Sequence, residues 1–93
     1  MANHQHPVFR FIKPLIIFNF GGACVICNKV CKSNHVHHMD NNSSNNDAFN
    51  FVLLCDHHHR LVHRCKFVVK PLLSSSQREF LQSLNDFLNI YKP

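Results

Sequence analysis

The sequence predicts a small α+β fold in one domain of 93 residues, and three observations support this prediction. Residues 35–39 and 49–54 have the length and composition of short strands, and the second segment could also run into a helix. Residues 40–47 between them are polar turn formers and predict a loop. Residues 74–91 carry apolar side chains at helical spacing. A chain this short builds only a marginal hydrophobic core, so a stabilising metal ion or disulfide is common at this size.

The N-terminal extension, residues 1–22, is expected to form extended structure. Residues 8–20 are dominated by β-branched and aromatic side chains, which favour strands. The region is expected to form one or two short segments, broken at Pro14, because proline has no N–H to donate to a sheet. Gly21 and Gly22 then predict a turn before the core begins.

Two helices are predicted after the second strand. Residues 56–64 are expected to form a short helix with Asp56 as its N-cap. Ser76 and Glu79 fit a capping box at the start of the C-terminal helix, residues 74–91. The apolar stripe of that amphipathic helix is expected to pack on the core. The stripe consists of Phe80, Leu81, Leu84, Phe87, Leu88 and Tyr91.

The charge balance of the chain suits a polyanionic partner. Ten Lys and Arg residues against five Asp and Glu residues give a net charge of +5. The longest apolar run, residues 15–18, is far too short to span a bilayer, so no membrane partner is expected. The N-terminus has no charged region followed by a cleavage site, so no secretory signal is apparent. We therefore expect an intracellular, reducing compartment.

Cysteine and histidine are the unusual residues of this chain, with five and nine copies. An odd number of cysteines without a secretory signal makes a disulfide framework the weaker interpretation, and metal binding by thiolates the stronger one. A Cys-x-x-Cys pair and a later Cys-x-x-His pair together supply the four donors of a structural zinc site. These donors are Cys24, Cys27, Cys55 and His58. Cys31 is a rival ligand, whereas Cys65 is expected to act as a small apolar side chain.

The remaining histidines suggest a second, unsaturated metal site. His59 and His63 are four residues apart on the predicted helix, so they face the same way. His37 and His38 are neighbours on a strand, so their side chains point to opposite faces. One of them could bind an ion with the helical pair while the other acts as a general base. A zinc protease of the His-Glu-x-x-His type is disfavoured, because no Glu precedes Glu79.

In chain order these residues are Cys24, Cys27, Val36, His37, His38, Asn50, Cys55, His58, His59 and His63. This order resembles the HNH endonuclease family over residues 24–63, about forty of the 93 residues. The resemblance implies a ββα-metal motif, with two strands and a helix around one catalytic ion and a structural zinc knuckle beside it. The family core would then occupy residues 23–65.

The resemblance also implies a role for each matching residue. His38 matches the general base that activates water, and Asn50 matches the central Asn that holds the loop and orients the base. His37, His59 and His63 match ligands of the catalytic cation. A shifted strand register, with His35 and His37 on one face, would instead make His37 the base.

Two departures from the family pattern stand in the sequence. The fourth position of the zinc knuckle, usually Cys, is His58, which zinc accepts. The loop between the strands lacks the usual glycines and is rich in Asn, which tolerates left-handed turns.

The function that follows from the resemblance is metal-dependent hydrolysis of DNA phosphodiester bonds with low sequence specificity. The catalytic cation would be Mg²⁺, Mn²⁺, Ni²⁺ or Zn²⁺; an all-imidazole site favours the last two on ligand softness. Four basic residues are candidates for phosphate contacts, Arg60, Arg64, Lys29 and Lys32. The Phe-rich N-terminus is expected either to pack on the C-terminal helix or to form a homodimer contact. The alternative function is a non-catalytic zinc-finger-like module that binds nucleic acid, and a metal-storage or sensor protein is a weaker third.

Overall fold

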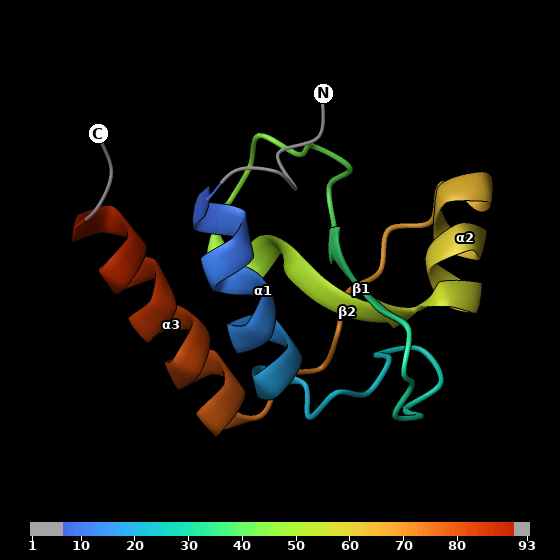
Figure 1. Ribbon diagram of the computed structural model, residues 1–93, viewed down its shortest axis with the longest axis horizontal. Helices are drawn as coiled ribbons and strands as arrows, with labels where there is room; N and C mark the ends of the chain where they lie inside the picture. The colour runs from blue at the N-terminus through green and yellow to red at the C-terminus, as the bar shows by residue number, and fades with distance from the viewer. Residues whose placement is uncertain (1–6, 91–93) are drawn as a thin grey trace.

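Two antiparallel strands lie between helices on both faces in the computed structural model, which describes residues 7–90 (Figure 1). The elements in chain order are α1 (Pro7–Asn19), β1 (Asn34–His38), η2 (Ala48–Asn50), β2 (Phe51–Cys55), α2 (Asp56–Cys65) and α3 (Ser75–Ile90). Helices α1 and α3 lie side by side on one side of the sheet, and α2 lies on the other. This arrangement confirms the small α+β fold and both predicted strands.

The register of the sheet sorts its side chains into two sets. His37 pairs with Val52, and His38 pairs with Phe51. Since directly opposed residues of a sheet share a face and successive residues alternate, neighbouring histidines face opposite sides. The set that faces α1 and α3 is Val36, His38, Phe51 and Leu53. The set that faces α2 is His35, His37, Val52 and Leu54.

The larger apolar core lies between the sheet and the helices α1 and α3. Val36, Phe51 and Leu53 of the sheet pack with pairs of buried residues from both helices. These helical residues are Ile12, Ile16, Leu81 and Leu84. Full burial of an aliphatic or aromatic side chain contributes roughly 1.5–3 kcal/mol, so this cluster is the main apolar source of stability. The predicted packing of the C-terminal helix on the core is confirmed.

The expectation of extended structure before Gly21 is wrong, because residues 7–19 form α1 with Pro14 inside it. Ile12 and Ile16 are four residues apart and fully buried, so a helix places both against the sheet. This burial outweighs the strand preference of the branched and aromatic side chains. Pro14 is exposed, so water can reach the carbonyl that loses its helical N–H donor.

Phe11 and Phe18 of α1 pack on α3, as one of the two sequence-based alternatives predicted. The rings of Phe11 and Phe87 stack with centroids 5.3 Å apart, and those of Phe18 and Phe80 lie 5.8 Å apart. Phe11 and Phe18 are seven residues apart, which returns them to one face of the helix.

Among residues 7–90, no helix is long and apolar enough to cross a bilayer.

Helix α1 ends in a glycine turn that directs the chain toward the cysteines. Gly21 has a φ of +63°, which favours glycine. Its N–H donates to the carbonyl of Phe18 at 3.0 Å, and the N–H of Gly22 donates to Ile17 at 2.9 Å. These two bonds form a Schellman motif, which satisfies carbonyls at the helix end.

Both predicted helix caps are displaced by one or two residues. Helix α2 is capped by Cys55, whose sulfur accepts from the N–H of His58, so Asp56 is the first helical residue instead of the cap. Helix α3 is capped by Ser74 instead of Ser76. The Ser74 hydroxyl accepts from the N–H of Gln77, and the Gln77 side chain accepts from the N–H of Ser74. Gln77 replaces Glu79 in this capping box because glutamine accepts equally well. Tyr91 lies outside the described residues.

Candidate metal centres

The predicted zinc ligands meet where a tight turn after α1 approaches the start of α2. Within the turn, the N–H of Cys24 donates to Lys29 at 3.1 Å, and that of Asn28 donates to Cys24 at 2.8 Å. Asn28 has a φ of 60°, which asparagine tolerates. The N–H of Val25 donates to Leu53 of β2 at 3.0 Å, which fastens the turn to the sheet.

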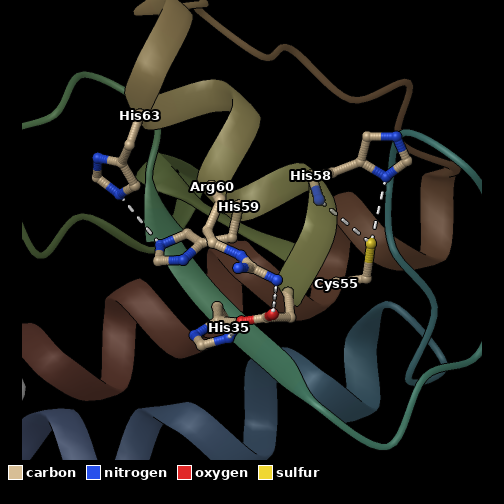
Figure 2. A network of polar contacts seen from close by, with 7 residues as sticks. His35, Cys55, His58, His59, Arg60 and His63 are labelled. Atoms are coloured by element: carbon tan, nitrogen blue, oxygen red, sulfur yellow. Dashed lines mark hydrogen bonds and ion pairs between the residues drawn. The ribbon is translucent and has the colours of Figure 1, made fainter.

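The four donor atoms of this knuckle lie within 4.8 Å of one another, and the donors belong to Cys24, Cys27, Cys55 and His58. The sulfur of Cys24 lies 3.6 Å from Nδ1 of His58. The sulfur of Cys55 lies 3.2 Å from the same atom (Figure 2). Sulfur and nitrogen donors around one tetrahedral zinc ion are about 3.6 Å apart. The cluster could therefore hold zinc. Cys31 and Cys65 are not part of it, and all five cysteines are free thiols.

Backbone N–H groups favour the thiolate form of Cys24 in the knuckle. Burial raises the pKa of Cys24, but N–H groups of Cys55, Cys27 and Ile26 outweigh this effect and lower the pKa to about 6. The N–H of Ile26, for example, donates to the Cys24 sulfur at 3.4 Å. Thiolate is the form that binds zinc, so these donors favour metal binding near neutral pH.

A second donor cluster joins β1 to α2. The nitrogens that His37, His59 and His63 offer lie within 4.8 Å of one another. Nε2 of His59 and Nε2 of His63 are 3.1 Å apart (Figure 2), close to the roughly 3.3 Å between two imidazole donors on one tetrahedral zinc ion. His58 and His59 are consecutive, yet they belong to different clusters, because neighbours on a helix point about 100° apart.

The buried nitrogen of His37 fits a metal ligand. His37 is only 3% exposed, and its Nε2 has no hydrogen-bond partner among the described residues. A buried polar atom without a partner is costly, and a coordinating cation would remove that cost. The ring stands edge-on to those of His59 and His63. The three residues therefore fit a divalent cation.

His37 and His59 are held in the neutral form that binds metals. Burial, and then the charges of His63 and His38, lower the pKa of His37 to about 4. Burial, followed mainly by the charge of His35, lowers the pKa of His59 to about 4. A neutral imidazole keeps a lone pair for coordination, so neither ring must lose a proton at neutral pH.

These lowered pKa values predict a specific response to acid in protein that carries zinc only in the knuckle. His37 and His59 should stay neutral at pH 5.5, where an imidazole with the ordinary pKa of 6.5 is mostly protonated. The unfolded chain then binds more protons between pH 6.5 and about 4, so the free energy of unfolding should fall as the pH falls through this window. Ring ¹⁵N chemical shifts measure the protonation directly. Protonated-ring shifts for either residue at pH 5.5 would contradict the prediction.

His38 and Asn50 lie at the loop end of the sheet. His38 is 5% exposed, packs against Phe51 with ring centroids 4.9 Å apart, and has Nε2 3.2 Å from Oδ1 of Asn46. Asn50 donates from its amide to the Asp40 carboxylate at 2.9 Å and to the Asn45 carbonyl at 3.0 Å. Its own amide oxygen accepts from the N–H of Asp40 at 3.2 Å. Asn50 therefore fixes the loop next to His38.

The predicted phosphate-binding residues are all exposed. Lys29 and Lys32 lie in the knuckle segment before β1, and Arg60 and Arg64 lie one turn apart on α2. Arg60 already contacts the Asp56 carboxylate at 2.6 Å, so part of its charge is compensated. Arg64, in the last turn of α2, has no ion-pair partner among residues 7–90.

Sequence reasoning considered His35 only in an alternative strand register and gave it no contact, yet it contacts both the helix and the second cluster. Its ring stacks on that of His59 with centroids 4.4 Å apart and planes 6° apart. Its Nε2 lies 3.1 Å from Oδ1 of Asp56, and this hydrogen bond is the main cause of the lowered pKa of Asp56. The signal was its spacing, because His35 and His37 are two apart on a strand and share a face.

Comparison with protein-family models, with curated proteins and with solved structures finds no significant match to this chain. The geometry of its own residues is therefore the basis for a functional proposal.

Proposed function

We propose that this protein is a metal-dependent endonuclease of the HNH type, which hydrolyses DNA phosphodiester bonds with low sequence specificity. The observation that carries this proposal is the convergence of His37, His59 and His63 from a strand and the following helix, with His38 next to His37. The order of two strands and a helix beside a cluster of zinc-type donors supports the proposal of a ββα-metal motif.

The three clustered histidines would hold one divalent cation. When bound, such an ion polarises a phosphate oxygen and stabilises the negative charge that develops on the leaving 3′ oxygen. Neutral His37 and His59 match this role, as does the absence of any hydrogen-bond partner for the buried His37 nitrogen among residues 7–90. The knuckle would hold a structural zinc ion and fix the start of α2.

His38 would accept the proton of the attacking water. Its position directly after His37, at the end of β1 that leads into the loop, supports this role. The loop held by Asn50 borders His38 through Asn46. For this role the Asn46 side chain, whose Oδ1 lies 3.2 Å from Nε2 of His38, would have to make way for the water.

DNA would be bound mainly through its phosphates. The net charge of +5 favours association with a polyanion. Arg64, Lys29 and Lys32 have exposed side chains that suit phosphate contacts. Arg60 has five N–H donors, so its contact with Asp56 leaves others for DNA. Phosphate contacts do not read bases, which is consistent with low specificity.

A plasmid assay with a series of cations tests this function. Supercoiled plasmid is incubated with protein that carries one equivalent of zinc, alone or with Mg²⁺, Mn²⁺, Ni²⁺ or further Zn²⁺. We expect nicked or linear DNA only when a cation is added. The exposed ligand His63 can be replaced without disturbing the core, and His63→Ala should cleave at least roughly 10- to 100-fold more slowly.

His57→Ala is the matched control, since His57 is an exposed histidine of the same helix that belongs to neither cluster. Its ring lies edge-on to that of His58 in the knuckle, so the zinc content of this variant is measured as well. The variant should cleave at the rate of the unmodified protein. Protein that retards DNA on a gel but leaves the plasmid intact with every cation would contradict the nuclease function. That result would support a non-catalytic zinc module instead.

A further inference from the structure

His35 is a half-buried histidine for which the proposed function has no role. It lies on β1 opposite Leu54, on the same face of the sheet as His37. Its side chain is 35% exposed, and both of its described contacts are with residues of α2. A polar side chain that connects a strand to the helix of a metal cluster is a candidate for orienting that cluster.

The ring of His35 covers one face of the His59 ring. The two planes are nearly parallel, at 6°, with centroids 4.4 Å apart (Figure 2). Nε2 of His59, on the edge of its ring, lies 3.1 Å from Nε2 of His63. The stack therefore restricts the plane of His59 while leaving the donor atom directed at the rest of the cluster.

The ring of His35 is itself held in place. Its Nε2 lies 3.1 Å from the carboxylate of Asp56, and the other oxygen of that carboxylate accepts from Arg60 at 2.6 Å. The N–H of Asp56 donates to the carbonyl of Ser33 at 3.2 Å, just before β1. The carboxylate accepts hydrogen bonds only, so the His35 nitrogen that faces it carries the proton.

We propose that His35, fixed by Asp56, is a positioning residue that holds the His59 imidazole in its metal-binding orientation. Metal-ligating histidines are usually oriented by a hydrogen bond to their second nitrogen. For His59, the orienting contact is the His35 ring that stacks on its face. A ligand that is already oriented loses less conformational freedom on binding, so the stack raises cation affinity. This inference rests on the proposed use of His37, His59 and His63 as a cation site.

Calorimetric titration of Ni²⁺ into protein that carries zinc only in the knuckle tests the role of His35. His35→Ala removes the stack and should weaken binding by roughly 10- to 100-fold. His35→Phe keeps a ring against His59 but loses the bond to Asp56, and it should restore most of the affinity. His57→Ala should bind as the unmodified protein does. Circular dichroism checks that each variant has equal helix content.

Cobalt spectroscopy separates positioning from direct coordination. The visible absorption of Co²⁺ in the histidine cluster should keep its shape in His35→Phe, because His35 is not a ligand. Unchanged Ni²⁺ affinity in His35→Ala would overturn the inference. The inference would also be overturned if His35→Phe bound Ni²⁺ as weakly as His35→Ala does and, in addition, had an altered cobalt spectrum. If the unmodified protein does not bind Ni²⁺, or binds it equally well after replacement of His63, the proposed cation site itself is overturned instead.

Discussion

Replacing Cys24 by alanine should leave the protein unfolded or aggregated. Cys24 has no exposed surface, and its sulfur is one of the four donors of the knuckle. Structural zinc contributes an apparent binding free energy of roughly 10–16 kcal/mol in small peptides, whereas a whole domain is stable by only about 5–15 kcal/mol. A knuckle with three donors should bind zinc far more weakly and leave the buried cluster around Val62 without its anchor.

Zinc content by elemental analysis and helix content by circular dichroism measure this effect together. Cys65→Ala is the matched control, because Cys65 is exposed and outside both clusters. It should keep one equivalent of zinc and the unmodified melting temperature. Chelation of zinc from the unmodified protein should reproduce the Cys24→Ala result. A Cys24→Ala protein with unchanged melting temperature would show that the knuckle does not stabilise the fold.

Replacing His38 should abolish DNA cleavage while the cation still binds. Loss of a general base typically slows a reaction by roughly 10²–10⁴-fold. His38→Ala also leaves a gap beside Phe51, since the two rings pack together, so instability could mimic a catalytic defect. His38→Gln is the sharper variant, because glutamine fills most of this space and can still donate to Asn46.

Plasmid cleavage and Ni²⁺ affinity, measured on the same samples, separate the two effects. His38→Gln should cleave at least a hundredfold more slowly and bind Ni²⁺ as tightly as the unmodified protein. A rate close to that of the unmodified protein would show that His38 is not the base. Reduced cation affinity in His38→Gln would indicate that His38 belongs with the ligands.

The strands, α2, the knuckle and the His59–His63 pair could be predicted because short-range spacing determines them, whereas the choice of His37 as the third donor came from the family resemblance. A strand reverses the side-chain direction at each residue, so His37 and His38 were expected on opposite faces, as the sheet register confirms. A helix brings residues four apart together, which places His59 beside His63. The knuckle followed from two pairs of donors with matching spacing, and its four donor atoms do converge.

Helix α1 could not be predicted in this way, because distant contacts decide its structure. Its branched and aromatic residues favour strands, and Pro14 disfavours a helix interior. The helix forms because Ile12 and Ile16 are buried against residues of β1, β2 and α3. The same holds for His35, whose contacts with Asp56 and His59 require the pairing of β1 with β2.

The adjacency of His58 and His59 on α2 has a consequence for the affinity of the two proposed ion sites for their ions. A single peptide bond connects a donor of the knuckle to a donor of the histidine cluster. An ion in the knuckle would immobilise the first turn of the helix, so the histidine cluster would already be ordered when a second ion binds. Thermodynamic linkage would then make the effect mutual, so that each bound ion would raise the affinity of the other site for its ion by the same factor.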